Sequence, residues 1–230
     1  MTRILIIGDV HTHYSAFVNL VNNTDVDIVL QVGDLGLYSD LNIANQDTMA
    51  IKHSPKLIKS FIYKLKNNAL KKLNKSVYFV KGNHDDYSFI EKQEFRDLGF
   101  IYIYNGTVVN IKDINILGFG GIYSPVQSTL SNFSLRNRSK RFFTEEDLMY
   151  TTNNVVGKKI DIALLHAAPT GVLPNFKEHE EGLALLNKVL AIANPKLVIH
   201  GHHHVNYINN NVIGLGNFCK NKNSYRIIDI

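Results

Sequence analysis

The apolar residues of the chain fall into short continuous runs, and most of these runs end in a polar residue. The five clearest runs are Ile4–Ile7, Ile28–Val32, Val77–Val80, Ile162–Leu165 and Leu197–Ile199. They are rich in β-branched residues and are continuous rather than alternating. This pattern is typical of strands that are covered on both faces. We therefore expect five buried strands.

Segments with helical spacing of apolar residues lie between these runs. The expected helices are Tyr14–Asn22, Pro55–Asn74, Thr144–Thr152 and Glu181–Ala193. Ser54 is an expected N-cap for the second helix, with Pro55 at its first position. Thr144 and Asp147 have the spacing of a capping box.

Further short strands are expected at Ile101–Tyr104, Thr107–Ile111, Ile114–Phe119, Val212–Leu215 and Tyr225–Ile228. Strands therefore alternate with helices and then follow one another in series. This order favours an α/β sandwich, in which ligands bind at the carboxyl ends of the strands.

Length and composition agree with an ordinary globular protein. The chain has 230 residues, of which 45% are hydrophobic and 20% are charged, and this suits one domain. The single cysteine, Cys219, excludes an intramolecular disulfide and a metal site built from cysteines. No run approaches the ~18 apolar residues of a membrane span, and Ile4–Ile7 is too short for the core of a signal peptide. We expect a single cytoplasmic domain over residues 1–230.

The net charge of +5 is unevenly distributed. Residues 48–84 contain nine lysines and no acid, and residues 134–141 contain four basic residues and no acid. The rest of the chain holds 12 basic and 20 acidic residues. The first region is more typical of a solvated helix face than of a binding surface. The second is more typical of an exposed loop, where arginines can contact phosphate.

Polar residues with metal-binding side chains follow the expected strands. Seven of them carry oxygen or imidazole donors of the kind that bind Mn, Fe or Zn: Asp9, His11, Asp34, Asn83, His166, His202 and His204. Each one alone has an ordinary explanation, such as a turn or a core histidine. Together, in this order and at strand ends, they indicate a site.

Seven donors are too many for one tetrahedral ion, but they suit two ions that share a carboxylate. Alternation along an extended chain would place Asp9 and His11 on one side and turn Val10 into the core. The same reasoning places His202 and His204 together. Two ions ~3.5–4 Å apart can clamp the attacking and leaving oxygens of an in-line phosphoryl displacement, with a bridging hydroxide as nucleophile.

The motifs Asp9-x-His11, Gly33-Asp34, Gly82-Asn83-His84-Asp85, His166 and Gly201-His202-x-His204 resemble those of the calcineurin-like metallophosphoesterases. The resemblance implies a four-layer α/β/β/α sandwich. It also implies two divalent cations, with Mn expected and Fe or Zn as alternatives. One ion would be held by Asp9, His11 and His204, the other by Asn83, His166 and His202, and Asp34 would bridge them.

The resemblance also assigns roles to the residues beside the metal ligands. His84 would stabilise the phosphoryl oxygens and protonate the leaving group, and Asp85 would orient His84. The phosphate-binding arginine of the Ser/Thr protein phosphatase branch is missing, because Gly33-Asp34 is followed by Leu35-Gly36-Leu37-Tyr38. Whether His13 lies beside the site or has a surface or core role stays open.

The segment 118–147, together with His166 to Pro169, resembles a bacterial subgroup of the family. In that subgroup the basic loop before the helix overhangs the site. Arg136, Arg138 and Arg141, with Lys140 between them, are therefore candidates to bind phosphate oxygens. A guanidinium can bind phosphate through two hydrogen bonds at once.

The expected function is hydrolysis of phosphomonoesters, on proteins or small molecules, by a dinuclear metal-dependent phosphoesterase. The alternative is a phosphodiesterase or nuclease acting on cyclic nucleotides or nucleic acid, which the lysines of residues 48–84 would favour. Nucleic acid is not the favoured partner, because the basic regions lack a stacking ladder of aromatic residues. A non-catalytic scaffold would be expected to have lost some of the seven donors or His84. No membrane partner is expected, and the oligomeric state is left open.

Overall fold

The computed structural model describes residues 1–174, 183–220 and 224–230. The helices are α1 Tyr14–Asn23, α2 Leu41–Asn45, α3 Thr48–His53, α4 Pro55–Lys66, α5 Gln93–Asp97, the 3₁₀ helix η1 Asn137–Arg141, α6 Glu145–Val155 and α7 Ala184–Ala193. The strands are β1 Arg3–Ile7, β2 Ile28–Gln31, β3 Val77–Phe79, β4 Phe100–Tyr102, β5 Val108–Ile111, β6 Ile114–Phe119, β7 Ile162–Leu165, β8 Leu197–His200, β9 Tyr207–Asn209, β10 Val212–Gly214 and β11 Tyr225–Asp229.

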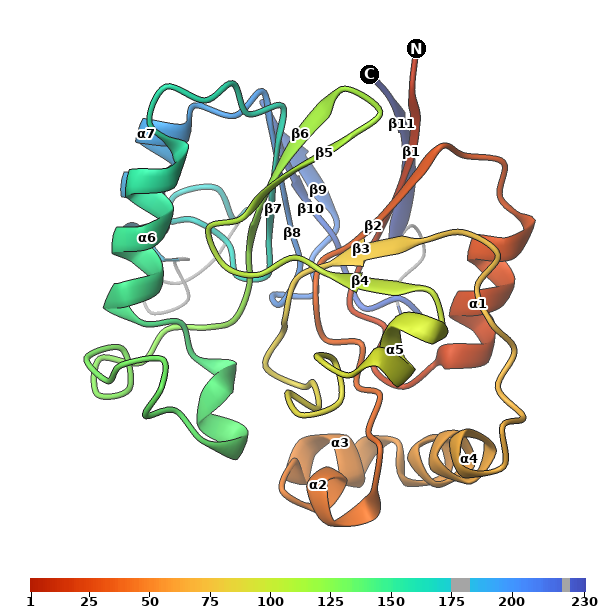
Figure 1. Ribbon diagram of the computed structural model, residues 1–230. Coiled ribbons are helices and arrows are strands. Elements are labelled where there is room, and N and C mark those ends of the chain that lie inside the picture. Colours follow the sequence, from red (N-terminus) through yellow and green to blue (C-terminus); the bar gives the residue numbers. More distant parts are fainter. Residues whose placement is uncertain (175–182, 221–223) are drawn as a thin grey trace.

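The strands form two sheets that face each other (Figure 1). One sheet has the order β11-β1-β2-β3-β4, and the other has the order β5-β6-β7-β8-β10-β9. In the first sheet β1 to β4 are parallel and β11 pairs antiparallel with β1, so that Ile4 lies opposite both Ile28 and Ile228. In the second sheet β6, β7, β8 and β10 are parallel, with β5 and β9 antiparallel at the edges.

The continuous apolar runs are buried on both faces, as expected. In β1, Ile4 and Ile6 belong to the core between the sheets, whereas Leu5 and Ile7 belong to the core beneath α1. This division follows from the two-residue period of a strand. Helices α6 and α7 cover the outer face of the other sheet, where Val155 and Val189 pack with Leu117 (Figure 1). The expected four-layer α/β/β/α sandwich is confirmed.

The helices differ from the expectations mainly between β2 and β3. The expected helix Pro55–Asn74 ends at Lys66, and Asn68 has a left-handed φ of 52°. Leu73 still packs against the core, but from an irregular segment. Within the described residues the Ser54 side chain makes no capping bond, whereas the Thr144–Asp147 capping box is confirmed. Residues 181–182 of the expected helix Glu181–Ala193 lie outside the described residues.

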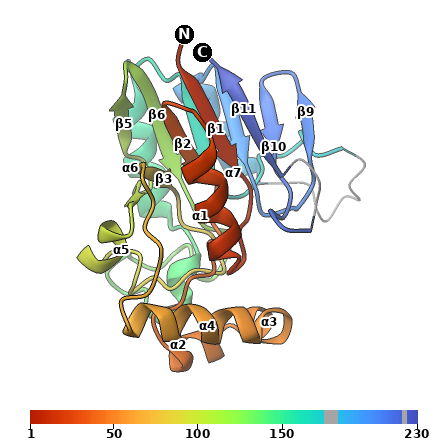
Figure 2. The same cartoon turned by 90° about the vertical axis from the view of Figure 1, so that its right-hand side faces the viewer.

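Strands β1, β2, β3, β7 and β8 all point their carboxyl ends to the same edge of the sandwich, away from the two termini (Figure 1). Helices α2, α3 and α4 lie beneath this edge (Figure 2). The loops that follow these strands carry the seven predicted donors. In the part of the chain that the structure describes, no helix has the length and apolar character needed to cross a membrane.

Candidate metal centre

Four of the predicted donors converge at the ends of β1, β2 and β8. The donor atoms of Asp9, His11, Asp34 and His204 all lie within 4.8 Å of one another. The Nε2 atoms of His11 and His204 are 2.9 Å apart. The Nε2 atom of His204 is also 3.0 Å from Oδ2 of Asp9.

A second group shares Asp34 with the first. The donor atoms of Asp34, His166 and His202 lie within 4.8 Å of one another. The Nε2 atom of His166 is 3.5 Å from Oδ1 of Asp34 and 3.0 Å from Oδ1 of Asn83. The structure thus gathers the other six donors around the carboxylate of Asp34, which faces both groups.

Left-handed backbone turns bring these donors together. His11, Asp34, His202 and His204 have φ values of 42°, 55°, 64° and 55°. The prediction that an extended chain places Asp9 with His11, and His202 with His204, by simple alternation is therefore wrong. Its other part, that Val10 is buried in the core, is confirmed. Left-handed conformations cost free energy for residues other than glycine and collect at functional sites. The chain turns sharply at these positions, and each turn aims a donor at the centre.

The donor set fits divalent cations. Oδ1 of Asp9 is buried and has no hydrogen-bond partner among the described residues, which is costly for a carboxylate unless a cation compensates it. The Nδ1 atom of His166 is 2.8 Å from the carbonyl oxygen of Val32. If Nδ1 carries the proton and donates it to that carbonyl, the Nε2 lone pair faces the centre, as in many metal-binding histidines.

The electrostatics of most of the cluster agree with this fit, whereas the hydrogen bond to Asp9 raises the pKa of His204. Burial lowers the pKa of His202 well below its ordinary value, and the neighbouring His166 lowers it further. Burial also lowers the pKa of His11. For Asp34, burial would raise the pKa, but the surrounding histidines hold it below the ordinary value. Neutral imidazoles and an ionised carboxylate are the forms that bind metals.

The ring of His84 is held by Asp47, which the sequence did not indicate. Its Nδ1 atom lies 2.8 Å from Oδ2 of Asp47. Burial lowers the pKa of His84, but the hydrogen bond to Asp47 and the charge of Asp34 together raise it to about 9. His84 also lies near the first donor group, with its ring centroid 5.5 Å from that of His11.

The expectation that Asp85 orients His84 is wrong. The carboxylate of Asp85 accepts hydrogen bonds from the backbone N–H groups of Gly82, Asp34 and Gly36, at 2.7, 3.2 and 3.1 Å. It therefore joins the loop after β3 to the loop after β2. Sequence proximity suggested the wrong partner, because the side chain of Asp85 is directed at backbone rather than at the neighbouring imidazole.

Asp47 connects three parts of the structure. Its Oδ1 atom accepts a hydrogen bond from the backbone of Ala50 and caps α3. Its Oδ2 atom accepts one from the Tyr38 hydroxyl at 2.7 Å and lies 3.1 Å from Nη1 of Arg138. The only sequence signal at Asp47 is that of a helix cap, which does not by itself indicate a site.

The structure separates the three predicted substrate-binding arginines. Arg138 reaches the site through Asp47. Arg136 instead donates to the carbonyl oxygen of Leu135 at 3.1 Å and lies over the ring of Phe133. Arg141 lies over the ring of Phe142. The basic loop therefore brings only the guanidinium of Arg138, among these three arginines, near His84, and the carboxylate of Asp47 contacts both groups.

A cavity of about 260 Å³ opens beside the donor cluster. His11, His84 and His204 line it from the strand loops, and His13 also reaches it. Met49, Ala50 and His53 of α3 form another part of its wall, and Lys220 adds a cation. The short helix α3 thus covers one side of the candidate site, a contribution that the sequence did not reveal.

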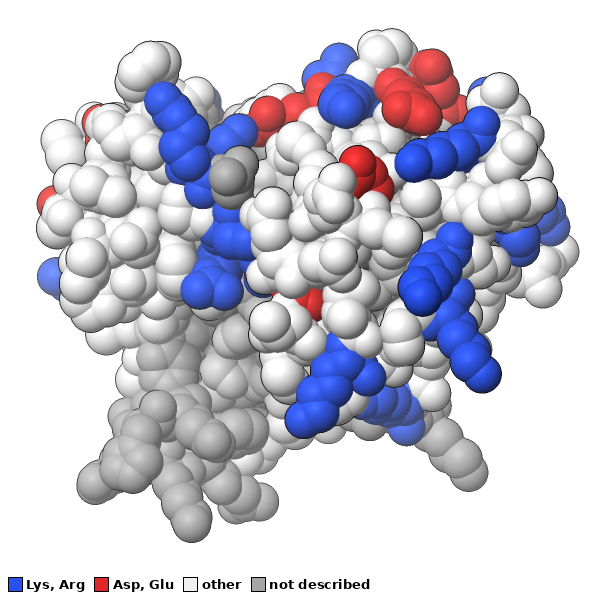
Figure 3. All heavy atoms as spheres, turned by 90° about the horizontal axis from the view of Figure 1, so that it is seen from below, with Lys and Arg blue, Asp and Glu red and all other residues white. Residues whose placement is uncertain are grey.

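The lysine-rich region is mostly a solvated surface, as expected. On α4, Lys56, Lys59, Lys64 and Lys66 are all exposed. Farther along, the Lys75 ammonium donates to the carbonyl oxygen of Thr24 at 2.6 Å. The face seen from below carries basic side chains in separate groups rather than in one continuous patch (Figure 3).

Comparisons with known proteins agree with this architecture. Residues 2–206 match the family model described as calcineurin-like phosphoesterase. One solved crystal structure is 15% identical, with a TM-score of 0.64 over 99% of this chain and 95% of that chain. The crystal structure of TT1561 of Thermus thermophilus is 13% identical, with a TM-score of 0.57 over 94% of this chain and 90% of that chain. At these identities the two structures show the fold alone. No curated protein matches the sequence.

Proposed function

Since the chain belongs to the calcineurin-like phosphoesterase family, we propose that it is a dinuclear metal-dependent phosphoesterase whose preferred substrates are phosphomonoesters. One observation carries the proposal more than any other. The carboxylate of Asp34 is shared by two groups of donors, each compact enough for one ion. A carboxylate that belongs to both groups can contact two neighbouring cations at once.

In the proposed centre, Asp9, His11 and His204 would hold one cation, and Asn83, His166 and His202 would hold the other. Asp34 would contact both. The donors are oxygen and imidazole atoms without a thiolate, which suits Mn, with Fe or Zn as alternatives. Two such cations supply acidification of a water molecule and neutralisation of charge on the phosphoryl group.

His84 is proposed to act on the phosphoryl and leaving-group oxygens. Its Nδ1 atom is occupied by Asp47 at 2.8 Å, so that Nε2 remains to donate to substrate. A pKa raised to about 9 keeps the ring protonated near neutral pH, and a protonated imidazole can stabilise an oxyanion and protonate the departing oxygen. Arg138, 3.1 Å from Asp47, would hold this carboxylate in place.

The shape of the cavity favours monoesters over diesters. The space beside His11 and His84 is about 260 Å³, with α3 on one side. It suits one phosphoryl group with a small leaving group, or the end of a phosphorylated side chain. Cleavage of diesters is the second candidate.

The proposal is tested with the full chain after its metal has been removed by a chelator and replaced with Mn. Initial rates are compared for p-nitrophenyl phosphate, bis(p-nitrophenyl) phosphate, a cyclic mononucleotide, a cyclic dinucleotide and single-stranded DNA. We expect turnover that requires Mn and a higher kcat/KM for the monoester. A higher kcat/KM for a diester, or binding of DNA that weakens steeply with salt, would support the alternative. An absence of Mn-dependent turnover with all five substrates would contradict the proposed phosphoesterase activity.

A further inference from the structure

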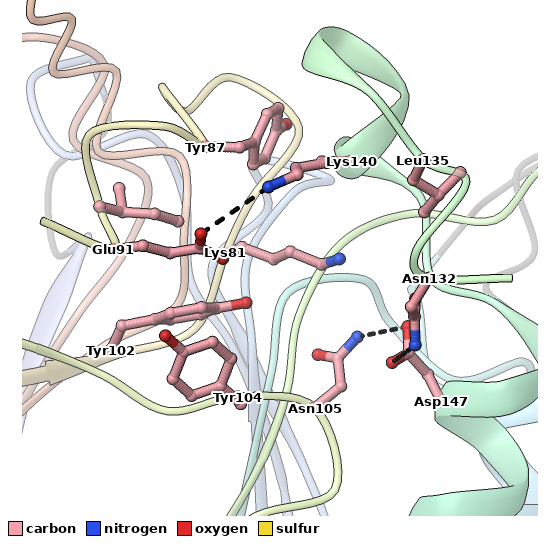
Figure 4. Close-up of a pocket in the computed structure, with 11 residues that line it drawn as sticks. Lys81, Tyr87, Glu91, Tyr102, Tyr104, Asn105, Asn132, Leu135, Lys140 and Asp147 are labelled. Carbon is pink, nitrogen blue, oxygen red and sulfur yellow. Dashed lines mark hydrogen bonds and ion pairs between the residues drawn. The ribbon is translucent and has the colours of Figure 1, made fainter.

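A second cavity, of about 240 Å³, lies beside the loop after β3 (Figure 4). Its walls come from the loop after β3, the end of β4 and the segment that leads into η1 and α6. Among the described residues, none that lines this cavity also lines the one beside His11 and His84. The two spaces are therefore distinct.

The side chain of Lys81 runs through this second cavity (Figure 4). Gly120 and Gly121 make room for its stem, because a Cβ atom on either glycine would lie 2.9 or 3.1 Å from Lys81 side-chain atoms. Its ammonium group donates to the carbonyl oxygen of Phe142 at 3.1 Å. Because the aliphatic part of Lys81 packs against two glycines and its ammonium group is hydrogen-bonded, the positive charge has a defined position.

Within the described residues, no carboxylate forms an ion pair with Lys81. The nearby Asp147 already accepts hydrogen bonds from Asn105, Asn132 and the backbone of Thr144, each at 3.0 Å. Glu91 is paired with Lys140 at 3.7 Å. The charges of Glu91 and Asp147 act on Lys81 without a direct ion pair. A lysine ammonium group has three donors, and one of those of Lys81 bonds to Phe142. The other two, together with Lys140, can donate to an anionic group placed in the cavity.

Aromatic rings form another part of the wall. Tyr102 and Tyr104 lie side by side, with ring centroids 4.4 Å apart (Figure 4). Neither hydroxyl group bonds to another group in the described part of the chain, so both are available to a ligand. Ile90 and Leu135 add buried apolar surface. Such a wall favours a flat ring, which can stack on tyrosine.

We propose that this cavity is a second binding site, for a small anion that carries a planar ring. The anionic group lies on Lys81 and Lys140, and the ring lies against Tyr102 and Tyr104. The site adjoins the loop of the candidate centre, since the hydroxyl of Tyr87 in its wall donates to the carbonyl oxygen of Gly82 at 2.9 Å. The proposal does not depend on bound metal or on the proposed phosphoesterase activity.

The test is calorimetric titration of the full chain with naphthalene-2-sulfonate, which has a ring and a charge but no phosphate ester. Naphthalene-2-methanol supplies the ring without the charge, and methanesulfonate supplies the charge without the ring. We expect the first compound to bind with and without Mn, and each of the others to bind at least about tenfold more weakly.

Two variants and two matched controls locate the site. We expect Lys81→Met to weaken binding of naphthalene-2-sulfonate about tenfold and Tyr104→Ala about fivefold. The controls Lys64→Met and Tyr63→Ala make the same substitutions on the exposed surface of α4. We expect them to leave the binding of naphthalene-2-sulfonate unchanged. Tyr104 is 45% exposed, so its variant remains informative even if Lys81→Met does not fold.

Three results would overturn the proposal. The first is equal binding by Tyr104→Ala and Tyr63→Ala. The second is equal binding of the charged and neutral ring compounds by the unmodified chain. The third is binding that requires Mn and is abolished by inorganic phosphate, because the compound would then occupy the candidate metal centre.

Discussion

The Oδ2 atom of Asp47 lies 2.8 Å from the Nδ1 atom of His84, although 37 positions separate the two residues. The carboxylate belongs to the N-cap of α3, and the imidazole belongs to the loop after β3. The short helix beneath the sheets therefore fixes the orientation and charge of the one histidine proposed to act on substrate. Because Arg138 also contacts Asp47, the basic loop is tied to the same point.

The pH dependence of turnover tests this pair. The protonated form of His84 is the proposed acid, so the rate falls as pH rises through its pKa. The charge of Asp47 contributes to raising that pKa to about 9. We expect Asp47→Asn to move the basic limb of the pH–rate profile to lower pH by about one unit.

Tyr38→Phe is the control for that experiment. It removes the 2.7 Å hydrogen bond to Asp47 but leaves the negative charge in place. We expect a smaller shift of the basic limb than in Asp47→Asn. An unchanged basic limb in Asp47→Asn would mean that a group other than His84 sets it.

Removal of the His84 ring tests its catalytic role. Proton transfer and oxyanion stabilisation by a positioned group contribute about 10²–10⁴-fold to rate. We expect His84→Ala to lower kcat for an aryl phosphate by about 10²-fold or more, with little change in the amount of Mn bound. An unaltered kcat would exclude the proposed role of His84.

The three arginines of the basic loop are expected to differ in effect. Arg138 contacts Asp47, whereas Arg136 and Arg141 lie over the rings of Phe133 and Phe142. We expect Arg138→Met to reduce kcat/KM several-fold, and more than Arg136→Met or Arg141→Met. Steady-state kinetics on all three variants measures this order. Equal losses would indicate that the loop contributes only general positive potential.

Metal removal is expected to change stability as well as activity. Ions that bind only the folded chain stabilise it, by about 2.7 kcal/mol at a concentration 100 times Kd. We expect Mn to raise Tm and a chelator to reverse the increase. In Asp9→Asn the increase should be much smaller, because Oδ1 of Asp9 is buried at the proposed centre and bonds to no group in the described part of the chain. An equal increase in both proteins would place Mn elsewhere.

Gly82→Ala tests how closely the loops pack around Asp34. A Cβ atom at residue 82 would lie 2.1 Å from the backbone nitrogen of Asp34 and 2.2 Å from its Oδ1 atom. We expect the variant to be destabilised by about 1–3 kcal/mol and to lose most of the Mn-dependent increase in Tm. Thermal unfolding with and without Mn measures both effects.

Gly157→Ala is the comparison for that variant. A Cβ atom at residue 157 would have no neighbour within 4 Å among the residues that the structure describes, although φ there is +71°. The substitution should therefore cost only backbone strain and leave the response to Mn intact. An unchanged Mn-dependent increase in Tm in Gly82→Ala would show that the loops after β2 and β3 can move apart without loss of metal binding.

Much of the fold could be predicted because each core strand carries its own signal. The run Ile4–Ile7 is continuous and apolar, and it is buried on both faces as that pattern indicates. The short helices α2, α3 and α5 gave no such signal, because five or six residues are too few to show a helical period. The expected helix from Pro55 ends early, since apolar spacing continues to Leu73 in a segment that packs without being helical.

The predicted donors do lie together, because the strands end at one edge of the sandwich. What the sequence could not reveal is which side chains meet across loops. Asp85 is adjacent to His84 in sequence but bonds to backbone, and Asp47 is remote but reaches the imidazole. Such pairings depend on how α3 lies beneath the sheets, which no local pattern encodes.

The dinuclear centre is tested most directly by titrating metal-free chain with Mn while bound metal and turnover of p-nitrophenyl phosphate are measured together. The account predicts that activity rises in proportion to binding and reaches its plateau at two ions per chain, and that Asp34→Ala binds less Mn and is inactive. A plateau at one ion, or full activity in Asp34→Ala, would contradict it.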